Sequence, residues 1–523
     1  MKNITIFKRN GYVASLLAVV MLLGTFSCKK GTFDINQTNP NSPTSVPPGT
    51  ALAAALTGTA NLIYSGAVGG NQDILNNWMG YWTQSGAYTP SNTFVLYQLT
   101  SSTGSGNWDV AYNNLSNYHA LIANVGTSSA NANYRAVGII MTSFVYQRIV
   151  DLYGSAPYTT ALVPNAQFSY KYDSGDVIYK GILAKLDTAI SIINANPSAS
   201  ALGKSDVMFQ GNMAKWIKFA NTLKLKILMR QTESSANGSL GSAAVQTALA
   251  GYTQASFLGA GEDASINPGY SNAADNQENP LYLDVVATAN GSPGINQKYY
   301  RANKYSVDFY TNNNDPRLAT LYYPNSSGVI QGRVYGSTLG TEANSIISAI
   351  TAFGLDATGN PNGPTVSSPI IPATESLFLQ AEAIKRGYLA GDLTNTFNSA
   401  VAESFRLYGV PNASAAATAY TSQVNTTTNI TASANQLATI ITQKWAALNG
   451  IDPLESFSDY RRLGIPKVPI SVYPGVTVTH IPFRFPYPLS ELNYNGGNVP
   501  SGGNGTESLT AHIFWMPANA DSF

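Results

Sequence analysis

The sequence contains few of the residues that most often carry catalysis or metal binding. It has one cysteine and three histidines in 523 residues. A single cysteine excludes an intramolecular disulfide and a cage of thiolate ligands. The histidines, His119, His480 and His512, are far apart in the sequence and show no metal-ligand spacing. The chain must therefore rely on its hydrophobic core, and at this length it can build a large one.

Charge is also scarce. Charged residues make up 11% of the chain, against about 25% in an average domain. The 29 basic and 28 acidic residues leave a net charge of +1, which excludes the basic field of a nucleic-acid-binding protein and a polybasic lipid-binding patch. Tyrosine is abundant, with 31 residues. Amphipathic rings beside amides and hydroxyls suit a neutral polyhydroxylated ligand, but they also suit an ordinary secreted surface.

Catalytic motifs are missing as well. The sequence has no HExxH, no GxSxG, no Walker A loop and no GxGxxG that opens a helix after a strand. A glycosidase needs only two carboxylates about 5–10 Å apart, but nothing singles out a pair among the 28 acids. We therefore predict a protein that is not an enzyme and that uses no cofactor; no metal-ligand residues can be named, and the sequence leaves bound calcium open.

No apolar run is long enough to span a bilayer. The N-terminal run, residues 13–23, has 11 residues, where a spanning helix needs about 20. Three basic residues precede it, as in a secretory signal peptide. The following LGTFSC, residues 23–28, is similar to the lipobox of a bacterial lipoprotein, although Phe26 and Ser27 differ from the commonest residues there. We expect a signal peptide over residues 1–27, lipid on Cys28, a tether over 28–48 and one domain over 49–523.

Apolar residues with helical period dominate the sequence from residue 108 onward. Such stripes predict helices over residues 108–119, 134–153, 177–193, 213–228, 374–388, 393–408 and 436–449. Four lysines within 213–228 fall largely outside the apolar stripe. The last helix should end at Asn449-Gly450, which tolerates a left-handed conformation. Helices of this length joined by short loops pack in antiparallel pairs.

A long interruption separates the fourth predicted helix from the fifth. Residues 250–371 show little helical signal and are punctuated by glycine, asparagine, serine and proline. A stretch this long inside a compact protein is usually functional or consists of short strands and loops. We predict an irregular insert that contributes the ligand face.

The C-terminal third has an unusual concentration of charge. Asp459, Arg461 and Arg462 lie close together in a chain that is otherwise poor in charge. This favours a positioned ion-pair network, with a solvated helix face as the alternative.

The same region carries a family resemblance. A helix with Gln-Lys-Trp is followed by ESFSDYRR at residues 455–462 and by RFPYPLSELNYN at residues 484–495. DPRL at residues 315–318 and ESLFLQAEA at residues 375–383 add to the pattern. These motifs resemble those of the SusD/RagB family, which are surface nutrient-binding lipoproteins of Bacteroidetes outer membranes.

The resemblance implies both a fold and a function. The fold is a mostly α scaffold, a tetratricopeptide-like solenoid of seven or eight main helices, with the ligand face built by loops outside it. The function is non-covalent capture of oligosaccharides at the outer face of the outer membrane, with delivery to a SusC-type TonB-dependent transporter. RagB-like members bind peptides instead, so a peptide ligand stays open as an alternative, and a surface glycosidase is a third.

Two aromatic clusters are candidates for the binding site. The first joins Trp82, Tyr88 and Asn92; Trp82 lies four residues after Trp78, so both could equally belong to the core. The second lies in the insert and comprises Asn267, Tyr270, Tyr299 and Arg301 with neighbouring tyrosines. We hypothesise a stacking platform from one cluster and amide contacts from the other, although buried tyrosines are common in any core.

Overall fold

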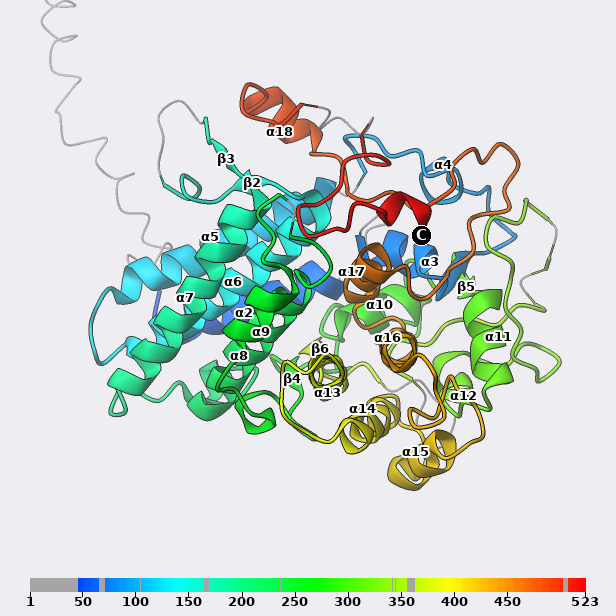
Figure 1. Ribbon diagram of the computed structural model, residues 1–523. Helices are drawn as coiled ribbons and strands as arrows, with labels where there is room; N and C mark the ends of the chain where they lie inside the picture. Colours follow the sequence, from blue (N-terminus) through cyan, green and yellow to red (C-terminus); the bar gives the residue numbers. More distant parts are fainter. Residues whose placement is uncertain are drawn as a thin grey trace, which may run out of the picture. The chain divides into compact units, whose positions relative to one another are not determined.

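The computed structural model describes residues 46–64, 71–103, 105–163, 169–235, 237–340, 342–343, 345–354, 363–501 and 507–523. The chain divides into two units, Met1–Pro47 and Pro48–Phe523, and the second is described below (Figure 1). The expected signal peptide, Cys28 and most of the tether lie outside the described residues. Within them, no helix has both the length and the apolar character that crossing a membrane requires.

Pro48–Phe523 is mainly helical, as predicted. The described part of the chain has eight helices of twelve or more residues: α2 (Pro48–Tyr64), α5 (Ser105–Val125), α6 (Ala132–Tyr153), α7 (Gly175–Ala195), α8 (Met213–Met229), α13 (Ala373–Lys385), α14 (Leu393–Leu407) and α16 (Gln436–Ala447). The shorter ones are α3 (Asn71–Trp78), α4 (Asn92–Val95), α9 (Gly241–Ala248), α10 (Pro280–Val285), α11 (Lys304–Asn312), α12 (Leu318–Leu321), α15 (Ala413–Thr421), α17 (Pro453–Leu463) and α18 (Leu489–Tyr494). Among the long helices, the sequence pattern missed only α2. Its many alanines, its glycines and its threonines make the buried and exposed faces similar in hydrophobicity, so no apolar stripe stands out.

The long helices pack in sequence order. Helix α5 contacts α2 and α6, α6 packs on α7, and α7 packs on α8. Helix α8 contacts α13, which in turn packs against α14 and α16. Figure 1 shows α5, α6 and α7 lying alongside one another, with α13, α14 and α15 continuing the array. This is the helical solenoid that the family resemblance implied.

The described residues form three two-stranded antiparallel ladders, of which the first and third join distant parts of the chain. They are β1 (Trp82–Gln84) with β5 (Tyr300–Ala302), β2 (Ala156–Pro157) with β3 (Tyr172–Asp173), and β4 (Ala264–Ile266) with β6 (Ser368–Ile371). Because β4 and β6 lie near the two ends of the predicted insert, their pairing closes it into a loop attached to the helices at its base.

The insert is more ordered than predicted, since it contains α10, α11 and α12. Helix α11 is stabilised by local interactions that hydrophobic periodicity cannot detect. The Asn303 side chain accepts a hydrogen bond of 2.9 Å from the backbone N–H of Tyr305, which caps the helix. Lys304 pairs with Asp308 one turn later at 2.7 Å.

Helix α16 contains the predicted apolar stripe. Ile440, Ile441 and Trp445 are buried, and Trp445 stacks on Tyr81 with ring centroids 5.1 Å apart. The helix ends near Gly450, whose φ of 73° lies in the left-handed region, as the Asn-Gly pair predicted.

The predicted ion-pair network is confirmed. Arg462 pairs with Glu382 of α13 at 2.6 Å and with Asp459 at 2.8 Å, and Lys444 of α16 reaches Asp459 at 3.0 Å. All four side chains are at most 3% exposed. The network therefore ties α13, α16 and α17 together inside the core.

Arg461 does not belong to this network. Its Nη1 donates hydrogen bonds of 2.7 Å to the carbonyls of Asp151 and Phe483. The guanidinium lies over the rings of Phe457 and Trp515, at 3.9 and 4.9 Å from their centroids. Burial lowers the pKa of Arg461 to about 9, so it stays charged at neutral pH and holds the C-terminal segment to α6.

Candidate functional site

The β1–β5 ladder brings the first predicted aromatic cluster beside Tyr299 and Arg301 of the second. Thr83 lies opposite Arg301, and Gln84 lies opposite Tyr300. The pairing continues beyond β1, because the N–H of Ser85 donates to the carbonyl of Tyr299 at 2.7 Å. The loop that carries Tyr88 therefore lies beside the turn that carries Tyr299.

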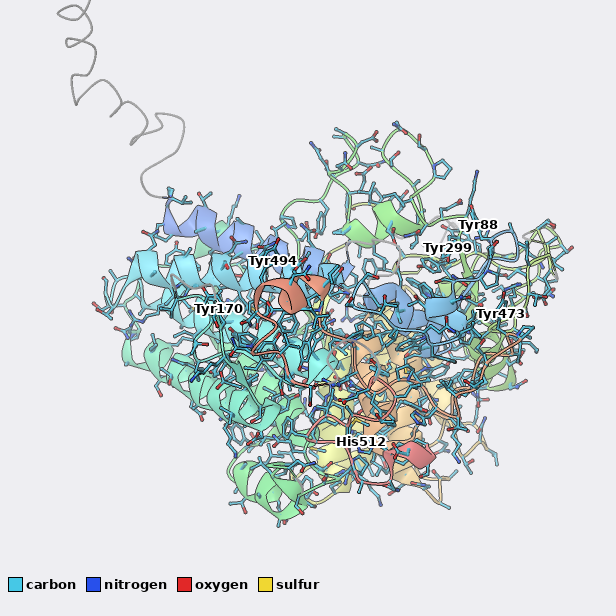
Figure 2. The ribbon with its side chains drawn as sticks, turned by 90° about the horizontal axis from the view of Figure 1, so that it is seen from above. Tyr88, Tyr170, Tyr299, Tyr473, Tyr494 and His512 are labelled. Carbon is cyan, nitrogen blue, oxygen red and sulfur yellow. The ribbon has the colours of Figure 1, made fainter. Side chains whose placement is uncertain are left out.

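Four rings form a chain from the core to the surface: Trp82, Tyr300, Tyr299 and Tyr88. The centroids of successive rings lie 5.5, 5.0 and 5.2 Å apart. Trp82 is 1% exposed, whereas Tyr88 is 39% exposed. Figure 2 shows Tyr88 and Tyr299 side by side at the edge of the molecule. The indole of Trp82 therefore supports the chain from beneath, and it does not offer the surface stacking face that we expected.

Gln84 organises this site, although no sequence pattern pointed to it. Its side-chain amide donates to the hydroxyl of Tyr299, and its carbonyl accepts from the N–H of Ser91 at 3.0 Å. Burial raises the pKa of Tyr299 to about 12, although the hydrogen bond from Gln84 opposes the shift. The Tyr299 phenol therefore stays neutral over the physiological range.

Arg301 and Asn92 have different roles. Arg301 is 8% exposed, and its Nη1 donates to the carbonyls of Gln297 and Tyr300 at 2.9 and 2.7 Å. Burial lowers the pKa of Arg301, and its contacts fix the turn below Tyr299. Asn92 begins α4, and its side chain is exposed beside this loop. Of the two, only Asn92 faces solvent in a way that suits direct ligand contact.

A hollow of about 530 Å³ lies beside Tyr270 of the second cluster. Tyr270 and Ile295 line it, and Ile295 lies four residues before Tyr299. The hydroxyl of Tyr270 lies 3.1 Å from that of Ser368. Asn267 does not line the hollow: its carbonyl accepts from the N–H groups of Gly269 and Tyr270, and its amide donates to the carbonyl of Thr365. Asn267 therefore shapes the loop that presents Tyr270.

Two buried carboxyls lie between this hollow and the ring chain. Asp73 and Asp284 are 2% and 3% exposed. Burial and the charge of Asp284 raise the pKa of Asp73 well above its usual range. Burial also raises the pKa of Asp284 to about 6, although a hydrogen bond from Asn296 lowers it. The pair therefore holds a proton at pH values where free aspartates are ionised.

We expect this pair to make the folded state less stable as pH rises. Between about pH 4 and 6 the folded protein holds a proton that the unfolded chain releases, so stability falls across that window. Asp284→Asn should remove the penalty and stabilise the protein by about 1–3 kcal/mol at pH 8, with no gain near pH 4. Urea unfolding across this pH range measures the difference. Asp308→Asn is the control, because Asp308 is 49% exposed and pairs only with the exposed Lys304 among the described residues. Equal stability of Asp284→Asn and wild type at pH 8 would contradict the argument.

One group of acids resembles a metal site. Among the described residues, Glu375, Asp452 and Glu455 form the only group of three or more potential ligands within metal-binding distance. Their carboxylates instead surround the Nζ of Lys226, at 2.9, 3.2 and 3.0 Å. The ammonium occupies the position that a metal would need, so the cluster is part of the ion-pair network.

Comparisons with known proteins agree with this architecture. The SusD-like family model, described as starch-binding and associating with the outer membrane, matches residues 40–488. No curated protein matches the chain.

Solved structures with similar folds cover almost the whole chain. A SusD homologue from Bacteroides fragilis has a TM-score of 0.71 at 20% identity, covering 90% of this chain and 100% of its own. A SusD/RagB family protein from Bacteroides thetaiotaomicron has a TM-score of 0.66 at 22% identity, with 90% and 99% covered. A chitin-binding SusD homologue from Flavobacterium johnsoniae has a TM-score of 0.66 at 20% identity, with 89% and 98% covered. At these identities the similarity establishes the fold.

Proposed function

The chain belongs to the SusD-like family, and on this basis we propose that it captures oligosaccharides non-covalently at the outer membrane. The protein would pass the ligand to a SusC-type TonB-dependent transporter, and lipid on Cys28 would anchor it facing the cell exterior. The ligand site is the surface formed by Tyr88, Tyr299 and Asn92, together with the hollow beside Tyr270.

The observation that carries this proposal is the chain of rings that ends at Tyr88 and Tyr299. Stacking on a sugar requires a flat ring that is held still, because ordering a mobile side chain would cost affinity. Tyr299 is held by Gln84 below it and by Tyr300 beside it. Its neutral hydroxyl can both donate and accept, which matches the hydroxyl groups of a saccharide.

A peptide ligand is less well supported at this site. Peptides commonly add a strand to an exposed sheet edge. The edge of β5 that faces away from β1 is already occupied, since the N–H of Ala302 donates to the carbonyl of Ser348 at 2.9 Å and Arg301 bridges to Ala349. This favours ring stacking over backbone pairing as the mode of recognition.

Calorimetric titration of the mature chain without its lipid tests the proposal. Soluble amylopectin, glycol chitin and a mixture of oligopeptides serve as ligands. We expect saturable binding to a glycan, weakened about tenfold or more by Tyr88→Ala or Tyr299→Ala through lost stacking. Tyr134→Ala, at a half-buried tyrosine of α6, is the matched control. Binding to peptides alone, or glycan binding that survives both substitutions, would contradict the proposal.

A further inference from the structure

A second aromatic cleft lies over α5, away from the Tyr88–Tyr299 pair. It encloses about 730 Å³, and its lining includes Trp108 and Tyr112, one turn apart on α5. Tyr170 and Tyr494 also line it, and Figure 2 shows both well separated from Tyr88 and Tyr299. The volume falls within the range of ordinary ligand pockets.

The cleft continues along α5 into a neighbouring hollow. That hollow has a volume of about 470 Å³ and extends to His119. Ala161 and Leu162 line both spaces. The combined groove is therefore elongated, and it suits an extended chain better than a single compact molecule.

The C-terminal motif RFPYPLSELNYN builds this cleft. Glu491 accepts a hydrogen bond of 2.8 Å from the hydroxyl of Tyr172. Asn495 clamps the backbone of Tyr170 from both sides, accepting from its N–H at 3.0 Å and donating to its carbonyl at 2.9 Å. Helix α18 is thus fixed to the segment that carries Tyr170, and the cleft is formed before any ligand binds.

The lining of the cleft matches the chemistry of a sugar. Tyr494 is 82% exposed, and among the described residues its hydroxyl has no hydrogen-bond partner. Asp109, Glu491 and Asn113 supply carboxylate and amide groups around the rings. Among the described residues no lysine or arginine lines the 730 Å³ cleft, and Lys185 lines the neighbouring hollow. Aromatic rings beside carboxylate and amide groups suit neutral saccharides. The carboxylates of Asp109 and Glu491 have no basic residue beside them in the cleft lining, so they repel polyanions.

We propose that this cleft is a second saccharide-binding site, which makes the protein bivalent for polymeric glycans. The inference rests on the proposed function, because it takes the ligand to be a saccharide. When two sites engage one polymer, the second binding event becomes intramolecular and affinity rises without any new contact type. Short oligosaccharides cannot reach both sites and gain nothing.

Affinity electrophoresis in gels containing amylopectin or glycol chitin, with calorimetry on maltotriose and chitotriose, tests the proposal. We expect Tyr494→Ala to weaken polymer binding about tenfold or more, whereas affinity for the trisaccharide at the Tyr88–Tyr299 pair does not depend on Tyr494. Tyr494→Phe keeps the ring and should keep most of the polymer affinity. Val424→Ala, at a side chain that is fully exposed elsewhere, is the control.

The outcomes separate the two proposals. A Tyr299→Ala protein that is still retarded by polymer, and loses that residual binding when Tyr494→Ala is added, supports the second site. A protein that binds polymer equally well with and without Tyr494→Ala overturns the second site and leaves the first intact. A wild-type protein that binds none of the four glycans overturns the proposed function, and the second site with it.

Discussion

Lys226→Met is expected to lower the free energy of unfolding by about 3–5 kcal/mol. The ammonium of Lys226 is 1% exposed and pairs with Glu375, Asp452 and Glu455. Asp452 keeps Arg148, and Glu455 keeps Arg230 and Lys444. Glu375 has no other ion-pair partner among the described residues, so the substitution leaves a buried charge uncompensated. Urea denaturation followed by circular dichroism measures the loss.

The effect should depend on pH. Burial raises the pKa of Glu375 to about 7, although the positive charge of Lys226 lowers it. Without that charge Glu375 is protonated more readily, so Lys226→Met should cost less at pH 5 than at pH 8. Lys218→Met is the matched control, because Lys218 lies on the same helix and its side chain, which pairs with Glu262, is 30% exposed. This substitution should lower the free energy of unfolding by less than about 1 kcal/mol. Equal losses in the two variants would show that the buried network contributes no more than a surface pair.

Trp82→Ala is expected to reduce both stability and ligand binding. Removing a buried tryptophan costs about 3–5 kcal/mol, and the Trp82 ring supports Tyr300, which in turn packs against Tyr299. The variant should fold at low temperature and bind the glycan more weakly, because Tyr299 loses its support and becomes mobile. Thermal unfolding and calorimetry on the same preparation separate the two effects.

A second tryptophan provides the control for this experiment. Trp216 on α8 is fully buried and packs against Phe209 and Phe219 in the helical part of the molecule. Trp216→Ala should therefore lose comparable stability but keep glycan affinity at temperatures where it is folded. If both tryptophan variants bind as wild type does, the ring chain is not needed to hold Tyr299.

Sequence pattern predicted the scaffold well because its signals are local. A stripe such as Ile440, Ile441 and Trp445 repeats with the period of the helix that it forms, so each helix can be recognised without knowing its neighbours. Scarcity of charge made the cluster around Arg462 stand out. Lys226 was not recognised, because it lies outside the apolar stripe of α8 and its carboxylates come from α13 and the α16–α17 region.

The proposed binding surface was harder to predict because burial there depends on distant pairing. Trp82 and Tyr88 are six residues apart, and both are aromatic residues near turn formers, yet one lies in the core and the other at the surface. The deciding fact is the pairing of β1 with β5, two strands of three residues each. Gln84 could not be predicted for the same reason. Its role depends on hydrogen bonds to Tyr299 and Ser91, and it belongs to no sequence motif.

The β1–β5 ladder also sets an order of events while the chain is being made. The side chain of Asn303 bonds to the carbonyl of Trp82, 221 positions earlier. At about 5–20 residues per second, β1 waits roughly 10–45 s after its own synthesis before its partner exists. During that interval the edge of β1, which begins at Trp82, is unpaired, and such edges attract other chains. The proposed ligand surface therefore cannot form before β5 has been made, and a truncated chain that ends before β5 would lack this surface.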